Sequence, residues 1–137
     1  MTPLETAQYM LDQDYFSQWM GIKLIDVREQ YCLIEMPVRK EMINGLKTLH
    51  GGVTFAMADS ALAFSSNNTG DAAVALNCII NYTKAGREGD VFRAESKLVS
   101  DTRKLGVYDI IITNQNGETV AGFRGTVYKL GKKVTEL

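Results

Sequence analysis

The chain has 137 residues, of which 45% are hydrophobic and 23% are charged, and its 15 basic and 16 acidic side chains give a formal net charge of −1. This composition is typical of one globular domain over 1–137 and argues against disorder. Because there is no basic excess, the chain lacks the electrostatic character that nucleic-acid binding requires. No apolar run approaches the roughly 20 residues of a membrane span, so neither a nucleic acid nor a membrane is expected as a partner.

Few residues are available for metal or disulfide chemistry. The only cysteines are Cys32 and Cys78, which form no CxxC motif, and His50 is the only histidine. We expect both thiols to be buried in a reducing, cytoplasmic environment. The polar, acidic start of the chain does not resemble a signal peptide, in agreement with that location. A metal site would need both cysteines and His50 from distant positions, so we expect no metal ion.

The first half of the chain predicts two helices that flank a pair of strands. Within 1–20, Thr2-Pro3-Leu4-Glu5 forms a capping box, and helically spaced apolar residues then predict a covering helix over 3–18. Alternation over 22–38 predicts two strands joined near Glu29-Gln30. The segment 53–68 is apolar or small on nearly all sides and contains one charge, Asp59. It predicts a helix that is buried on several sides.

The second half predicts strands throughout 73–130. In the first of them, alternation would place Val74, Leu76, Cys78, Ile80 and Tyr82 on one face. Further strands follow after short connections, and Asn116-Gly117 is a strong hairpin signal. Strands joined in this way are expected to be antiparallel. The predicted fold class is therefore α+β.

The segment from Asn44 to Asp59 carries the candidate chemistry. Gly51 and Gly52 lie where the buried helix begins, and the first turn of a helix has backbone N–H groups without partners. Because glycine lets a ligand approach the backbone closely, this turn could bind a developing oxyanion. Asp59 is a carboxylate in an apolar helix, and burial there would raise its pKa toward the range of a useful base or nucleophile. The alternative is an aspartate that caps or pairs locally.

Helix geometry limits how these groups can cooperate. Asp59 follows Gly51 by eight residues, which is about 12 Å along a helix axis. One carbonyl could hardly contact both groups of the same chain. If both act on one substrate, they must come from two chains, and a two-fold dimer with antiparallel helices would bring them together. The catalytic hypothesis therefore predicts a dimer.

The motif Asn44-Gly45-Leu46-Lys47-Thr48-Leu49-His50-Gly51-Gly52, followed by Ala58-Asp59-Ser60-Ala61, resembles the signature of hotdog-fold thioesterases. It is most similar to their phenylacetate-degradation branch. Further matching segments at 16–21, 82–90, 106–109 and 123–125 extend the resemblance over most of the chain. The resemblance implies a long helix wrapped by a curved antiparallel sheet, assembled as a dimer or tetramer, and metal-free hydrolysis of acyl-CoA. Coenzyme A would then be part of the substrate and not a cofactor.

The resemblance also implies roles for individual residues. Asp59 would be the base or nucleophile, the Gly51 N–H of the neighbouring chain would polarise the carbonyl, Asn44 would orient substrate or water, and His50 would lie beside the sulfur or support the loop. Some relatives place a hydroxyl residue where this chain has Ala75, and another branch has one at the position of Ala63. The group that holds the attacking water is therefore open, with Ser60 and Asn77 as substitutes. The expected substrate contacts are Gly52, Ala75 and Asn77, with the CoA phosphates at Lys84, Arg87, Arg103, Lys104 and Arg124.

Two other functions are compatible with the same fold. A hydratase or dehydratase of acyl thioesters would use a histidine and a carboxylate as acid and base. A non-catalytic module would bind acyl-CoA without hydrolysing it. The leading prediction is an acyl-CoA thioesterase for a small-to-medium or aryl acyl group.

Overall fold

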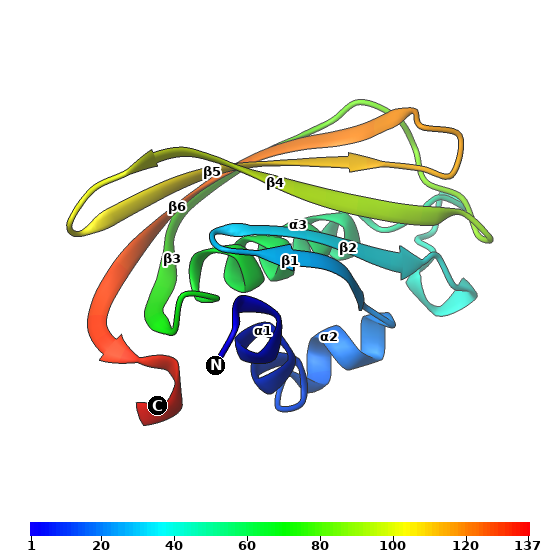
Figure 1. Cartoon of the computed structure of the whole chain (residues 1–137). Helices are drawn as coiled ribbons and strands as arrows, with labels where there is room; N and C mark the ends of the chain where they lie inside the picture. The colour runs from blue at the N-terminus through cyan, green and yellow to red at the C-terminus, as the bar shows by residue number, and fades with distance from the viewer.

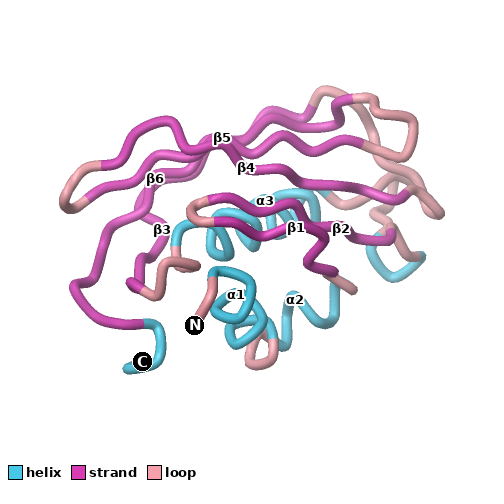
Figure 2. Tube along the Cα trace, in the orientation of Figure 1, coloured by secondary structure: helices cyan, strands magenta, loops and turns pink.

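A curved antiparallel sheet arches over one long helix, and two short helices lie on the open side (Figures 1 and 2). The computed structural model describes all residues, 1–137. The sheet has six strands in the order β1-β2-β4-β5-β6-β3. The strands are β1 (Lys23–Arg28), β2 (Tyr31–Pro37), β3 (Asp71–Tyr82), β4 (Val91–Asp101), β5 (Leu105–Thr113) and β6 (Thr119–Lys133). The helices are α1 (Pro3–Leu11), α2 (Tyr15–Met20) and α3 (Gly51–Ser66), with 3-10 turns at Lys40–Met42 and Val134–Glu136.

The core lies between α3 and the concave face of the sheet. Met57, Leu62 and Phe64 of α3 are almost fully buried, together with Ile110 and Ile112 of β5. The prediction of a helix buried on several sides is met, because α3 contacts the sheet on one side and α1 and α2 on the other. The helix begins at Gly51 and not at residue 53 because His50 caps it, and it ends at Ser66.

The single N-terminal helix predicted over 3–18 is wrong: the segment forms two helices. The predicted capping box at Thr2 and Glu5 is present and begins α1. Asp14 then caps a second helix, since its carboxylate accepts hydrogen bonds from the Ser17 N–H at 2.9 Å and from the Ser17 hydroxyl. Helical spacing of apolar residues continued through this break, so periodicity alone did not reveal it. Gly21 ends α2 with a left-handed φ of 75°.

The single apolar face expected for β3 is also wrong, because the strand contains a bulge. The register against β6 shifts between Ala75 and Asn77, which reverses the faces of the residues that follow. Ala73 packs against the core before the bulge, and Cys78 and Ile80 pack against it afterwards. Several large side chains of β3 are nevertheless exposed: Val74, Leu76, Ile79 and Tyr82 are 48–62% exposed. Since β3 is an edge strand, it presents both unpaired backbone groups and an apolar surface.

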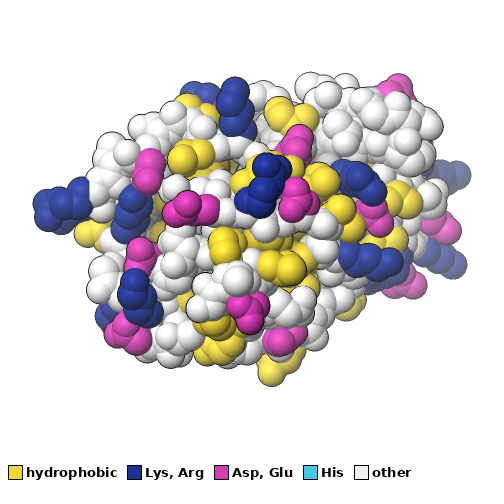
Figure 3. Space-filling model, in the orientation of Figure 1, with side chains coloured by type: hydrophobic (Ala, Val, Ile, Leu, Met, Phe, Trp, Pro, Cys, Tyr) yellow, Lys and Arg dark blue, Asp and Glu magenta, His cyan; other side chains and the backbone are white.

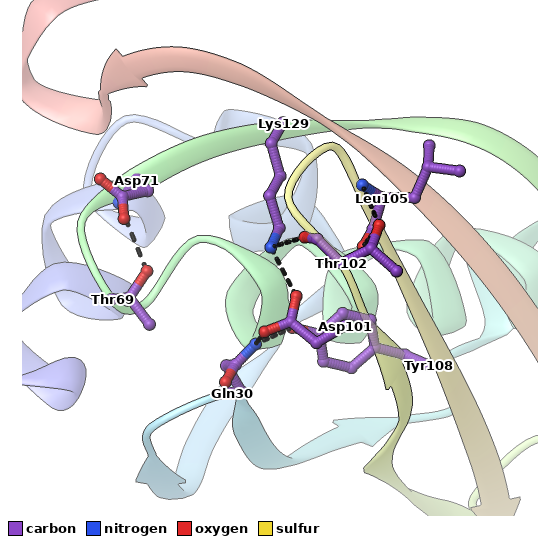
Figure 4. A network of polar contacts seen from close by, with 8 residues as sticks. All are labelled: Gln30, Thr69, Asp71, Asp101, Thr102, Leu105, Tyr108 and Lys129. Atoms are coloured by element: carbon purple, nitrogen blue, oxygen red, sulfur yellow. Dashed lines mark hydrogen bonds and ion pairs between the residues drawn. The ribbon is translucent and has the colours of Figure 1, made fainter.

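A polar network ties together the end of the fold remote from Gly51 (Figure 4). Gln30, in the β1–β2 turn, donates from Nε2 to Asp101 Oδ2 at 3.1 Å and to the Tyr108 hydroxyl at 3.3 Å. Lys129 of β6 donates to the other oxygen of Asp101. This contact is the main reason why the pKa of Asp101 is lowered. The network joins turns that are distant in sequence and holds the twisted sheet in register at this end.

No helix in the structure combines the length and the apolar character needed to cross a membrane. On the face drawn in Figure 3, basic and acidic side chains are interspersed, and no broad basic patch is visible.

Gly125 of β6 allows α3 to approach the sheet closely. A Cβ at this position would lie 2.6 Å from Leu62 Cδ2 and 2.9 Å from Phe123 Cε1. We expect Gly125→Ala to lower the free energy of unfolding by about 1–3 kcal/mol, because the added methyl overpacks the helix–sheet contact. Gly122→Ala on the same strand is the matched control, since its Cβ would meet only Ile111 at 4.0 Å. Urea unfolding of both variants tests this, and equal midpoints would contradict it.

Candidate active site

Asp59 projects from α3 into a hollow with a mainly apolar wall. The hollow has a volume of about 210 Å³, and six of its eight lining residues are hydrophobic, among them Leu62, Val74 and Val127. The Asp59 carboxylate takes part in none of the ion pairs and side-chain hydrogen bonds of the chain. The structure therefore does not show the alternative, in which Asp59 would cap a helix or pair with a nearby side chain. A carboxylate left unpaired in apolar surroundings is available for chemistry.

The surroundings of Asp59 favour its protonated form. Loss of hydration against the apolar wall raises the pKa of this carboxyl, and the negative charge of Asp14 raises it further. The side chain is nonetheless exposed in the single chain, so it remains accessible to water and substrate. A carboxylate with a raised pKa is a stronger base at neutral pH than an ordinary aspartate.

Gly51 begins α3 with a free backbone donor. The His50 Nδ1 atom accepts the Gly52 N–H at 2.8 Å and caps the helix. Val53 and Thr54 donate to the His50 carbonyl, so the Gly51 N–H is the donor of this turn that has no partner within the chain. Because the helix dipole is positive here, the Gly51 N–H is suited to a carbonyl oxygen that gains negative charge.

The Gly51 turn is fixed by β3 and by the preceding loop. Tyr82, at the end of β3, donates its hydroxyl to the Gly51 carbonyl at 2.8 Å. Asn44 Oδ1 accepts from the Leu46 N–H at 2.9 Å and the Thr48 N–H at 3.2 Å, which closes the loop before His50. The contacts of Asn44 and His50 are thus local supports of the loop. The Asn44 amide Nδ2 and the His50 Nε2 make no hydrogen bond within the chain and remain available to a ligand.

The two candidate catalytic groups, the Gly51 N–H and the Asp59 carboxylate, lie far apart within one chain. Gly51 and Asp59 belong to the same straight helix, about 12 Å apart along its axis and about 80° apart around it. Gly51 lines one hollow together with Thr54, Tyr82 and Lys84, whereas Asp59 lines another. The structure therefore brings Asn44, His50, Gly51 and Gly52 together and leaves Asp59 apart from them.

Of the two expected substrate contacts on β3, Ala75 lines the same hollow as Asp59. Asn77 does not line it; it lies just after the bulge, and its side chain is exposed. Ser60, the other residue considered for water, is committed to a buried hydrogen bond with Ser17 at 2.8 Å. Cys78 is not a competing nucleophile, because burial, aided by the nearby charge of Asp59, raises the pKa of its thiol.

The five expected phosphate contacts do not form one cluster in the chain. Lys84 borders the Gly51 hollow and pairs with Glu118 at 3.3 Å, and Arg87 shares a neighbouring hollow with it. Arg103 and Lys104 line a different hollow, beside Tyr128 and Lys129. Arg124 is held on β6 by two hydrogen bonds to Asp109, at 2.6 and 2.9 Å. Lys84 and Arg87 thus accompany Gly51, and the other three lie elsewhere.

Two residues of the site were not assigned from the sequence. The sequence places Tyr82 in a strand and at the start of the matching segment 82–90, but nothing in its local pattern indicates the contact with Gly51. Asp14 falls inside the single helix predicted over 3–18, although an aspartate can begin a helix by accepting the backbone N–H of the residue three positions later, here Ser17.

No group of three His, Cys, Asp or Glu side chains lies close enough to hold a metal ion. The expectation that no cofactor is needed stays a prediction.

The fold is shared with known thioesterases. The family model of the thioesterase superfamily matches residues 46–121. The acyl-coenzyme A thioesterase PaaI of Escherichia coli is 37% identical over 96% of this chain and 94% of its own length. The structure of the E. coli PaaI protein from the phenylacetic acid degradation operon matches with a TM-score of 0.94 at 36% identity, over 96% of this chain and 95% of that one.

Two similar structures from streptococci contain coenzyme A or acetyl CoA. A hypothetical thioesterase from Streptococcus pneumoniae with coenzyme A is 26% identical and has a TM-score of 0.85, over 90% of this chain and 98% of that one. A Streptococcus mutans protein bound to acetyl CoA is 29% identical with a TM-score of 0.79, over 82% of this chain and 90% of that one.

The helix wrapped by a six-stranded antiparallel sheet is the hotdog fold, as the family resemblance implied. This chain belongs to the thioesterase superfamily and is a thioester hydrolase.

Proposed function

We propose that this chain hydrolyses acyl-CoA thioesters to the free acid and CoA, with Asp59 as base or nucleophile and the Gly51 N–H of the partner subunit as carbonyl donor. The observation that carries the proposal is the unpaired Asp59 carboxylate in its apolar hollow. The E. coli relative named as an acyl-coenzyme A thioesterase and the streptococcal structures with CoA ligands support the substrate class. The acyl group is a small-to-medium or aryl one, in keeping with the phenylacetic acid operon of the E. coli protein.

The chemistry starts from an ionised Asp59. As a base, it takes a proton from water while the water oxygen adds to the thioester carbon. The Gly51 N–H stabilises the resulting oxyanion. Collapse of this intermediate breaks the C–S bond, and the CoA thiolate takes the proton back from Asp59. As a nucleophile, Asp59 would itself add to the carbon, expel the thiolate and form an anhydride that water then hydrolyses. Both routes need the same two groups in one place.

A dimer through β3 would supply this arrangement. β3 is a twelve-residue edge strand whose outward side chains Val74, Leu76 and Ile79 are exposed. An antiparallel pairing of two copies about Cys78 would place Tyr82 of one copy opposite Val74 of the other. Tyr82 holds Gly51, and Val74 lines the Asp59 hollow. The pairing would therefore join the two half-sites and extend the sheet across both chains. The expected assembly is a dimer or a pair of dimers, and light scattering measures its mass.

The free cysteines Cys32 and Cys78 are consistent with the cytoplasmic location that we propose.

Release of free thiol tests the activity directly. The purified chain is incubated with acetyl-, butyryl-, hexanoyl-, octanoyl- and phenylacetyl-CoA in the presence of a chromogenic thiol reagent. We expect thiol release from at least one acyl-CoA. If no thiol appears from any of them, the proposed function is wrong.

The pH dependence of the reaction should report the raised pKa of Asp59. Only the ionised carboxylate can act, so kcat/KM falls as the pH decreases through the pKa of Asp59. Because the apolar wall and Asp14 raise that pKa, we expect the acidic limb of the profile above the usual aspartate range. The measurement is kcat/KM with one acyl-CoA from pH 4 to 8. An acidic limb at or below the ordinary aspartate value would contradict this assignment.

A further inference from the structure

The hollow at Asp59 adjoins a second one that reaches the N-terminal helices. Ala63 and Ala73 line both hollows, so the two lie side by side. The second hollow has a volume of about 300 Å³ and is bordered by Tyr9 and Met10 of α1 and by Asp14 at the start of α2. The two adjoining hollows, from Asp59 to Asp14, are called the groove below.

The groove is apolar, and its charged side chains are both acidic. Six of nine lining residues in the second hollow are hydrophobic, and its one charged side chain is Asp14. The first hollow has Asp59 as its one charged side chain. Neither carboxylate is paired with Lys, Arg or His, as the seven ion pairs of the chain involve other groups. The wall therefore has an uncompensated negative charge at two points.

Hydrogen bonds fix the position of Asp14. Its carboxylate caps α2 through the Ser17 N–H, and the Ser17 hydroxyl contacts Ser60 Oγ at 2.8 Å in the core. Ser60 directly follows Asp59 in α3, so α2 is attached to the helix at the level of the reaction centre. The field of Asp14 reaches that centre, since its charge contributes to the raised pKa of Asp59.

We infer that Asp14 is a specificity-determining residue that excludes acyl groups with a terminal carboxylate. The inference rests on the proposed acyl-CoA hydrolysis, because the groove starts at Asp59 and its occupant is the acyl chain of the thioester. A neutral alkyl or aryl group gains by contact with the apolar wall. A dicarboxylic acyl group would bring a second negative charge into the groove beside Asp14, with no cation to neutralise it, and would lose its hydration.

The test compares valeryl-CoA with succinyl-CoA, whose acyl groups are similar in length but differ in charge. For the wild-type protein at low ionic strength, we expect kcat/KM to be at least about tenfold higher for valeryl-CoA, because the terminal carboxylate of the succinyl group and the Asp14 carboxylate would repel each other within the groove. In Asp14→Asn the preference should shrink by about fivefold, mainly through faster use of succinyl-CoA. Asparagine caps helices as well as aspartate does, so the fold should be retained.

Asp12→Asn is the matched control. Asp12 lies in the same connection, and its carboxylate accepts from Gln8 Nε2 at 2.7 Å, but it does not line the groove. This variant should keep the wild-type preference for valeryl-CoA.

A binding experiment gives the same comparison without turnover. It measures dissociation constants for the non-hydrolysable thioether analogues of valeryl-CoA and succinyl-CoA. If these analogues bind with the expected preference but no thioester is hydrolysed, the proposed function fails and the inference stands. Equal use and equal binding of the two acyl groups, or a preference unchanged by Asp14→Asn, would overturn the inference.

Discussion

Asp59→Asn is expected to lower kcat by at least about 100-fold, because removal of a catalytic base or nucleophile costs this much or more. Asparagine has nearly the same shape as aspartate, but it can neither accept the proton of the attacking water nor form an anhydride. The Asp59 side chain makes no hydrogen bond within the chain, so the substitution breaks no structural contact. The measurement is thiol release under saturating acyl-CoA, and activity near the wild-type level would exclude the assigned role.

The stability of the same variant provides the control for folding. The pKa of Asp59 is raised in the folded chain, so the folded state binds this proton more tightly than the unfolded state does. Ionisation of Asp59 therefore destabilises the fold, and this cost grows as the pH rises from the unfolded pKa through the folded one. Asp59→Asn should have a melting temperature at pH 7 equal to or above that of the wild type, and this difference should vanish at pH 3. A clear loss of stability at pH 7 would indicate that Asp59 is structural.

The second prediction is that each active site combines Gly51 of one chain with Asp59 of the other, and a mixed dimer tests it. Gly51→Val is expected to lower activity by about 100-fold, the typical cost of losing an oxyanion donor. The added Cβ would lie 3.2 Å from the Tyr82 ring, and its methyl groups would shield the N–H. A heterodimer of Gly51→Val with Asp59→Asn has one site in which both groups are intact, provided that they come from different chains. Purified with two affinity tags, it should regain about half of the wild-type activity.

The outcome of this mixing experiment distinguishes the two arrangements of the site. If Gly51 and Asp59 of one chain served the same substrate, every site of the heterodimer would lack one group, and its activity would not exceed that of the parents. Gly45→Val is the matched control, because Gly45 lies in the loop that precedes Gly51 and a Cβ there meets nothing within 4 Å. It should keep near wild-type activity.

Much of the fold follows from local patterns. The capping box at Thr2, the alternation over 22–38 and the apolar helix around Asp59 each correspond to an element of the structure. These signals succeed because capping, alternation and all-round apolarity are properties of a few neighbouring residues. The break between α1 and α2 and the bulge in β3 were not foreseen. In both cases the apolar pattern continues through the irregularity. The break is set by the local cap from Asp14 to Ser17, whereas the bulge is defined by the register of β3 against β6.

The sequence by itself determined the α+β class, the candidate oxyanion turn at Gly51 and the isolated carboxylate at Asp59. It also determined that one helix separates these groups by too great a length for both to reach one carbonyl, since the rise per residue is a constant of the α-helix. Only the tertiary structure decided that Asp59 is unpaired, that Tyr82 holds the Gly51 turn and that Asp14 faces the same groove as Asp59. These facts depend on how α2, α3 and β3 pack, because a side chain's partners are set by distant segments that local sequence does not specify.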